Sequence, residues 1–163
     1  MKGKFMNKIK SFTVNHTTLI PGIYESRVDS YNDTRITTLD IRLKRPNIEP
    51  VLYTAEIHTM EHLGATYLRN HAIFKDRIVY FGPMGCRTGF YLLVEGDHHR
   101  EALYNLIVET FQFIRDFEGE IPGNTAIECG NYLDHNLTLA KQASSEYIDL
   151  LRKNERKSLN YPD

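Results

Sequence analysis

Alternation of apolar and polar residues marks the early chain as strand-rich. In residues 36–43, Leu39, Ile41 and Leu43 alternate with Asp40 and Arg42. The three apolar side chains are therefore expected to face a core, and the two charged ones to face the other side of a sheet. Four other segments also have strand character: 9–14, 23–29, 77–81 and 88–95.

Helical periodicity begins after residue 50. Thr54 is expected to cap a helix that runs to about Asn70, because its hydroxyl can accept a hydrogen bond from a free backbone N–H of the first turn. Asp97 is expected to cap a second helix, whose apolar stripe indicates core packing and consists of Leu103, Leu106, Ile107, Thr110, Phe111, Ile114 and Phe117. A third helix is predicted from about Leu137 to Lys153.

These elements predict an α+β domain of two layers, a mainly antiparallel sheet flanked by helices. Asn32-Asp33 supports this class as a turn between extended segments. The 163 residues suit one domain over 1–163, with a core at about 9–153 and frayed ends.

Charge and cysteine content narrow the functional classes. The net charge of −1 provides no basic surface for nucleic acid. The N-terminal lysines precede no apolar run, so neither a signal peptide nor a membrane span is expected, and the cytoplasm is the expected location. Only two cysteines occur, Cys86 and Cys129, and in a reducing compartment they favour thiol chemistry or metal binding over a disulfide.

The strongest chemical signal is His58-Thr59-Met60-Glu61-His62, an H-x-x-E-H pattern within a predicted helix. Residues four apart share a helix face, so His58 and His62 can bind one metal ion. Glu61 lies on nearly the same face and can accept a proton beside that ion. The alternative is two surface histidines on a solvated helix.

A catalytic metal site needs a third protein ligand and an open fourth position. Cys129, Glu128, Cys86 and the remaining histidines are all candidates. Cys129 precedes a glycine in an irregular stretch, where the backbone can fold close to an ion, and a thiolate beside two imidazoles suits Zn(II), Co(II) or Fe(II).

Four other polar residues allow two interpretations each. Cys86 lies in a glycine-rich loop and is either a small core residue or a proton carrier in a cleft. Arg42 is either solvated or oriented toward a substrate oxygen. His16 is either a pocket residue or a residue without a site role, and His135 either supports a metal ligand or starts a helix.

Seven segments together resemble the S-ribosylhomocysteine lyase (LuxS) family in order and spacing, over about residues 11–153. They are Ser11–His16, Leu39–Arg42, Arg45–Asn47, His58–Leu63, Arg69–His71, Pro83–Tyr91 and Glu128–Gly130. No single segment is specific, but the combination of P-M-G-C-x-T-G, H-T-x-E-H and a downstream C-G is.

The resemblance implies a role for each matching residue. His58, His62 and Cys129 would hold one divalent metal ion per subunit, Fe(II) with Zn(II) or Co(II) as substitutes. Glu61 would be the main general acid and base, and Cys86 the second proton carrier. Substrate contacts would come from the following residues: Ser11 and Arg42 on the sugar oxygens, and Phe12 and His16 lining the pocket.

The resemblance also implies a reaction and an assembly. S-ribosylhomocysteine would be cleaved to homocysteine and 4,5-dihydroxy-2,3-pentanedione, the autoinducer-2 precursor of quorum sensing, by carbonyl migration and β-elimination. The enzyme would be a homodimer with sites at the interface, serving signalling or the recycling of a by-product in the activated methyl cycle.

Three positions depart from the family pattern. Asn15 replaces a frequent Asp, Gly64 replaces a bulkier apolar residue, and Tyr80-Phe81-Gly82 replaces an acidic-apolar-Ser pattern. None is a proposed ligand or proton carrier, so the departures bear on substrate contacts and catalytic efficiency.

Two other functions would use the same motif. A metallopeptidase would recruit a glutamate such as Glu128 as third ligand. A closed structural site would use His58, His62, Cys86 and Cys129, and would leave Glu61 without a purpose.

Overall fold

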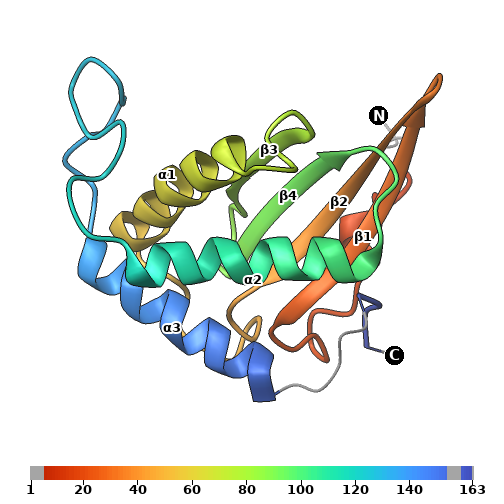
Figure 1. Cartoon of the computed structure of the whole chain (residues 1–163). Helices are drawn as coiled ribbons and strands as arrows, with labels where there is room; N and C mark the ends of the chain where they lie inside the picture. The colour runs from red at the N-terminus through yellow and green to blue at the C-terminus, as the bar shows by residue number, and fades with distance from the viewer. Residues whose placement is uncertain (1–5, 154–158, 163) are drawn as a thin grey trace, which may run out of the picture.

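The computed structural model describes residues 6–153 and 159–162, which form a four-stranded antiparallel sheet with helices packed against it (Figure 1). The strand order is β1-β2-β4-β3. The strands are β1 (Gly22–Tyr31), β2 (Thr34–Arg42), β3 (Ile78–Pro83) and β4 (Gly89–Glu95). The helices are the short 3-10 helix η1 (Lys10–Phe12), α1 (Thr54–Asn70), α2 (Arg100–Asp116) and α3 (Leu137–Lys153). The predicted α+β class is confirmed.

The core lies between the sheet and the three long helices. Leu39, Ile41 and Leu43 are buried within it, as the alternation predicts. Phe90 of β4 contacts Phe111 of α2 edge-to-face, with ring centroids 6.4 Å apart. The helix α1, which carries the histidine motif, packs against β3 and α2.

Gly89 shows why the loop between β3 and β4 ends in glycine. It pairs with Arg42 across the β2–β4 ladder, and a Cβ at this position would lie 2.1 Å from the carbonyl oxygen of Ile41. The close approach of the two strands therefore excludes any side chain. The same pairing brings the loop with Cys86 to the end of β2.

Three expectations about local structure are wrong. Residues 9–14 are not a strand, because Phe12 and Thr13 donate backbone hydrogen bonds three residues back and form one 3-10 turn. Thr54 is the first residue of α1 rather than its cap. The cap position is Tyr53, whose backbone N–H donates a hydrogen bond to the Glu56 carboxylate at 2.9 Å. The cap position of α2 is His99 and not Asp97.

The C-terminal end also differs from the frayed end expected. Residues 154–158 and 163 lie outside the described residues, but residues 159–162 lie on the sheet. Leu159 is only 1% exposed, and its carbonyl accepts a hydrogen bond from the Glu25 N–H of β1 at 2.7 Å. Burial of this leucine and the backbone bond hold the segment in place.

No helix among the described residues is long and apolar enough to cross a membrane.

Candidate metal centre

Four metal-ligating side chains converge beside α1. The candidate ligand atoms of His58, His62, Cys129 and His135 all lie within 4.8 Å of one another. The two motif histidines are one helical turn apart on α1, and the long loop 117–136 brings the other two residues to them. The Sγ of Cys129 lies 3.4 Å from the Nε2 of His58. Cys129 is thus the thiol that joins the motif, as the sequence suggested.

Backbone carbonyls orient both motif histidines. The Nδ1 of His58 lies 2.9 Å from the carbonyl oxygen of Asp134, and the Nδ1 of His62 lies 2.7 Å from that of Pro122. A carbonyl only accepts hydrogen bonds, so each Nδ1 carries the proton and each Nε2 keeps its lone pair. Fixing the tautomer through the second ring nitrogen is the usual way in which proteins prepare a metal-binding histidine.

His135 is the member of the cluster that the sequence did not single out as a ligand. Its Nδ1 lies 3.2 Å from the Thr59 hydroxyl, which donates to the Ala55 carbonyl and accepts from the Asn136 N–H. The hydroxyl has one proton, so it must accept from the Nδ1 of His135. The Nε2 is then an unprotonated, buried atom without a hydrogen-bond partner among the described residues.

The environment of His135 favours its neutral form. Burial lowers the pKa of this imidazole, and the neighbouring His58 and His62 lower it further. The sequence offered His135 either as a support for a metal ligand or as the start of a helix, and no periodic pattern links it to the other ligand candidates.

Ring geometry separates ligands from neighbours within the cluster. The rings of His58 and His62 are perpendicular, at 90° with centroids 4.6 Å apart. The rings of His58 and His135 are stacked, 20° apart at 4.1 Å. An imidazole binds a metal in its own ring plane at about 2.0–2.1 Å, so two stacked rings cannot both bind one ion. His58, His62 and Cys129 are therefore a candidate set of three ligands for one metal ion.

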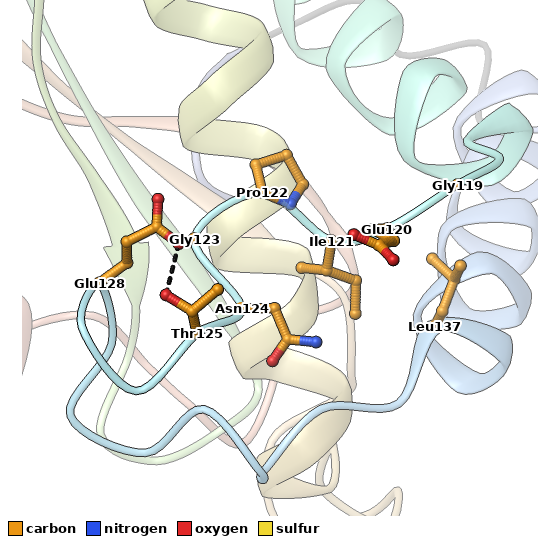
Figure 2. A pocket seen from close by; sticks show the side chains of 9 residues that line it. All are labelled: Gly119, Glu120, Ile121, Pro122, Gly123, Asn124, Thr125, Glu128 and Leu137. Atoms are coloured by element: carbon orange, nitrogen blue, oxygen red, sulfur yellow. Dashed lines mark hydrogen bonds between the residues drawn. The ribbon is translucent and has the colours of Figure 1, made fainter.

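The loop 117–136 also forms a pocket of about 550 Å³ next to the cluster (Figure 2). Its lining includes Pro122 and Gly123. The positive φ of 73° at Gly123 and the 3.2 Å from its ideal Cβ position to the Nδ1 of His62 make glycine the favoured residue here. Figure 2 shows Glu128 directed at Thr125, whose hydroxyl donates to its carboxylate at 2.7 Å. Glu128 is not part of the metal cluster.

The remaining motif residue, Glu61, is half-buried on α1 between the two histidines. Among the described residues its carboxylate makes no hydrogen bond or ion pair, which leaves it available to a bound molecule. Two imidazoles with fixed tautomers, one thiol and a nearby carboxylate fit a divalent transition-metal ion as the bound group.

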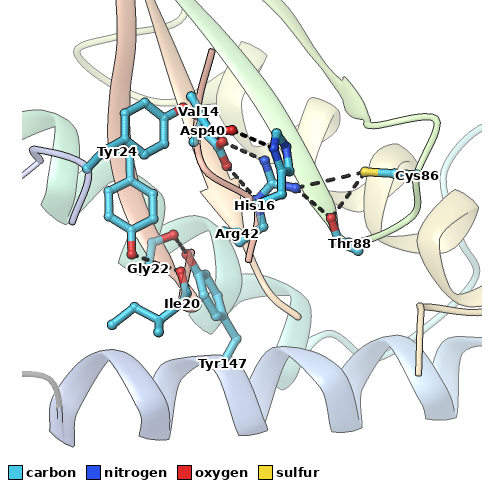
Figure 3. A network of polar contacts seen from close by, with 11 residues as sticks. Val14, His16, Ile20, Gly22, Tyr24, Asp40, Arg42, Cys86, Thr88 and Tyr147 are labelled. Carbon is cyan, nitrogen blue, oxygen red and sulfur yellow. Dashed lines mark hydrogen bonds and ion pairs between the residues drawn. The ribbon is translucent and has the colours of Figure 1, made fainter. Parts of the chain in front are cut away.

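A second polar cluster surrounds Arg42 (Figure 3). The guanidinium donates to Asp40 through Nε at 3.1 Å and Nη2 at 2.6 Å, and to the Thr88 hydroxyl through Nη1 at 2.6 Å. The same Nη1 lies 3.9 Å from the Sγ of Cys86, which lies 3.1 Å from the Thr88 hydroxyl. Burial alone would lower the pKa of Arg42, but the hydrogen bond and charge of Asp40 outweigh it and raise the pKa.

Cys86 therefore faces Arg42 and not the metal cluster of its own chain. Its side chain is exposed at the tip of the β3–β4 loop, whereas a closed four-ligand site would need it next to His58. Within the described residues of one chain, the closed site that includes Cys86 is not formed.

The N-terminal candidates form a third group. Ser11 and His16 are half-buried, and Phe12 is 70% exposed on η1, which packs against β1. The Nδ1 of His16 lies 2.9 Å from the Val14 carbonyl. Within the described chain none of the three makes a hydrogen bond to the metal cluster.

The fold and the site together define a class of protein: an α+β domain with one side-chain cluster that could hold a metal ion and a separate polar cluster around Arg42 and Cys86. A family model described as S-Ribosylhomocysteinase (LuxS) matches residues 9–158. The chain is 54% identical over 158 residues to the S-ribosylhomocysteine lyase of Clostridium acetobutylicum, which covers 97% of this chain and all of that protein. The lyases of Clostridium beijerinckii and Porphyromonas gingivalis are 52% and 53% identical over 159 residues, again 97% of this chain and all of each relative.

The chain belongs to the S-ribosylhomocysteinase (LuxS) family, as its motifs predicted. The peptidase alternative receives no support, because the relatives are carbon-sulfur lyases and because Glu128 is bonded to Thr125 away from the metal ligands.

Proposed function

We propose that this chain cleaves S-ribosylhomocysteine to homocysteine and 4,5-dihydroxy-2,3-pentanedione. The observation that carries the proposal is the convergence of His58, His62 and Cys129, in a chain that carries Glu61 on the same helix as the two histidines and matches the lyase family over residues 9–158. The substrate and the reaction class are taken from the names of the relatives, and the two products are those that the motif resemblance implies.

His58, His62 and Cys129 would hold the ion. When bound, a divalent ion acts as a Lewis acid on a carbonyl or hydroxyl oxygen of the substrate. The two-nitrogen, one-sulfur donor set suits Fe(II), Co(II) and Zn(II), and we propose Fe(II) as the physiological ion. Metal analysis of protein purified without oxygen tests this choice.

Glu61 would move the protons between carbon and oxygen. The sugar opens to an aldehyde, and the carbonyl then migrates along the chain in two proton-transfer steps until it is β to the thioether. A carboxylate that makes no hydrogen bond to the described part of the chain is free to accept either a carbon-bound or an oxygen-bound proton. Glu61 is therefore the main acid and base of the proposal.

Cys86 would act in the later steps. Loss of the proton α to the final carbonyl breaks the carbon-sulfur bond, and the departing homocysteine sulfur takes up a proton. Cys86 is exposed and lies next to a guanidinium, so it can give up and take back a proton at the substrate. Ser11 and Arg42 would contact the sugar oxygens, and Phe12 and His16 would line the pocket.

A homodimer would complete each site. Two large apolar side chains of the loop that carries Cys129 are exposed, Ile127 at 98% and Leu133 at 79%, and this loop projects beyond the sheet and helices in Figure 1. A second copy would cover these side chains and bring its own Cys86 and N-terminal residues to the metal. Since both thiols are free, we also propose the cytoplasm as the location.

The test is product analysis with purified, metal-loaded protein. Incubation with S-ribosylhomocysteine should release one homocysteine, measured with a thiol reagent, for each dicarbonyl product trapped by an aromatic diamine. Thiol release without the dicarbonyl would indicate a different cleavage, and release of neither product would refute the proposed function.

A further inference from the structure

The charges of Asp40 and Arg42 are buried on the face of β2 opposite to the core. Asp40 is 1% exposed and Arg42 is 2% exposed. Such a pair is stabilising only when its remaining donors and acceptors are also bonded, because both charges have lost their hydration. The Nη1 of Arg42 meets this need through Thr88, and the free lone pairs of Asp40 need a further donor.

Tyr161 supplies that donor from the far end of the sequence. Its hydroxyl donates to the Oδ2 of Asp40 at 2.9 Å, the same oxygen that accepts from the Nη2 of Arg42. The Ser26 side chain also hydrogen-bonds to the phenol. Burial raises the pKa of Tyr161, and the negative charge of Asp40 raises it further. The phenol is therefore a permanent donor at neutral pH.

The C-terminal segment is held in place by contacts that do not involve Asp40. The Leu159 side chain and carbonyl bind it to β1, and Arg100 donates to the Asn160 side chain at 3.0 Å. The ring of Tyr161 stacks on Tyr24, with centroids 4.9 Å apart and 19° between the planes. Since the segment is fixed independently, the phenol can act as a rigid support for the carboxylate.

We propose that Tyr161 is a positioning residue for the reaction. Its hydroxyl holds the Asp40 carboxylate, Asp40 holds two of the three guanidinium nitrogens of Arg42, and Arg42 is thereby held against Cys86 and Thr88. The C-terminal end thus controls a substrate-contacting arginine and the environment of a proton-carrying thiol. The catalytic part of this inference rests on the proposed function.

The test compares Tyr161→Phe with wild type and with Tyr104→Phe in the full-length, metal-loaded protein. Phenylalanine keeps the stacking on Tyr24 and removes only the hydroxyl. Tyr104 is the matched control, because its hydroxyl donates to the Leu151 carbonyl at 3.3 Å between α2 and α3. Three quantities are measured: kcat and KM, metal content with thermal stability, and the rate at which iodoacetamide alkylates Cys86 at one fixed pH.

A hydrogen bond to a charged group contributes enough to predict a fall of about tenfold in kcat/KM for Tyr161→Phe. The alkylation rate of Cys86 should change several-fold in the same variant, with metal content unchanged, while Tyr104→Phe matches wild type in both. An unchanged alkylation rate in Tyr161→Phe would overturn the proposal, even if activity fell together with thermal stability, because that pattern marks a purely structural role.

The two proposals fail in different ways. If wild type releases no homocysteine, the proposed function is wrong, and the alkylation rates still report whether Tyr161 acts on Cys86 through Arg42. If wild type is active but Tyr161→Phe keeps wild-type kcat/KM and alkylation, only the positioning role is wrong.

Discussion

Gly64, one of the departures from the family pattern, packs against Phe81. Gly64 lies on α1, and Phe81 lies on β3 within the Tyr80-Phe81-Gly82 segment. An ideal Cβ at position 64 would be 2.4 Å from the Cε1 of Phe81, 2.9 Å from its Cζ and 3.2 Å from its Cδ1. The large ring therefore occupies the space that a side chain at position 64 would need.

The perturbation that tests this is Gly64→Ala, alone and with Phe81→Leu. In the wild-type background the Phe81 ring must move by about 1 Å to reach normal carbon-carbon contact, but it is 6% exposed and stacks on Phe90 at 5.1 Å. Overpacking of this kind costs about 1–3 kcal/mol. Replacing glycine within a helix contributes about 1 kcal/mol in the opposite direction. The net expectation is a destabilisation of about 0–2 kcal/mol.

In the Phe81→Leu background the sign should reverse. Leucine lacks the two ring atoms closest to the new methyl group, so the clash is removed. The higher helix propensity of alanine over glycine then remains as the main effect of the substitution. Gly64→Ala should then stabilise by up to about 1 kcal/mol. The coupling free energy of the cycle is the strain alone, about 1–3 kcal/mol, because the propensity cancels.

The assay is urea unfolding of the four proteins at one protein concentration and one metal content, since dimerisation or metal binding would otherwise shift the apparent stability. The Tm values should change in the same direction as the free energies of unfolding, by about 2–4 °C per kcal/mol for a chain of this size. Free energies that add within about 0.5 kcal/mol would show that Gly64 and Phe81 are independent and refute the reasoning.

Four further variants test the site. Cys129→Ala should lose the metal, whereas Glu128→Ala should keep it, because Glu128 is bonded to Thr125; elemental analysis of both decides, and the reverse pattern would favour a peptidase-like ligand set. Glu61→Gln should keep fold and metal and lose about 10²–10⁴ in kcat, the usual contribution of a general acid-base group; a wild-type rate would remove Glu61 from the mechanism. Cys86→Ala should also keep the metal and stall after carbonyl migration begins, which product analysis by NMR can follow; normal homocysteine release would contradict its role.

The sequence predicted the sheet and helices well where periodicity is strong. The alternation in β2 correctly placed Leu39 in the core, and the third helix has the predicted bounds. Periodicity could not find the 3-10 turn at residues 10–12. A segment this short contains too few apolar residues to distinguish a helical period from a strand period. Side-chain caps failed for a related reason: Thr54 and Asp97 are good capping residues, but the chain enters each helix at a neighbouring residue.

The candidate site was predicted in part. Helical spacing places His58 and His62 on one side of α1, and the structure brings Cys129 to them. The sequence left His135 either as a support for a metal ligand or as the start of a helix, because its place depends on the path of the loop 117–136 and on a bond to Thr59. Tyr161 was equally hidden, since a residue near the end of the chain gives no local signal of a contact with β2.

The central claim is that a metal-dependent lyase site is formed by His58, His62 and Cys129. The most direct measurement is homocysteine release from S-ribosylhomocysteine by protein stripped with a chelator and then reloaded with Fe(II) or Co(II) without oxygen. We expect no release from the stripped protein and recovery of activity at one ion per subunit. Equal release with and without the ion, or no release from a folded and fully loaded protein, would contradict it.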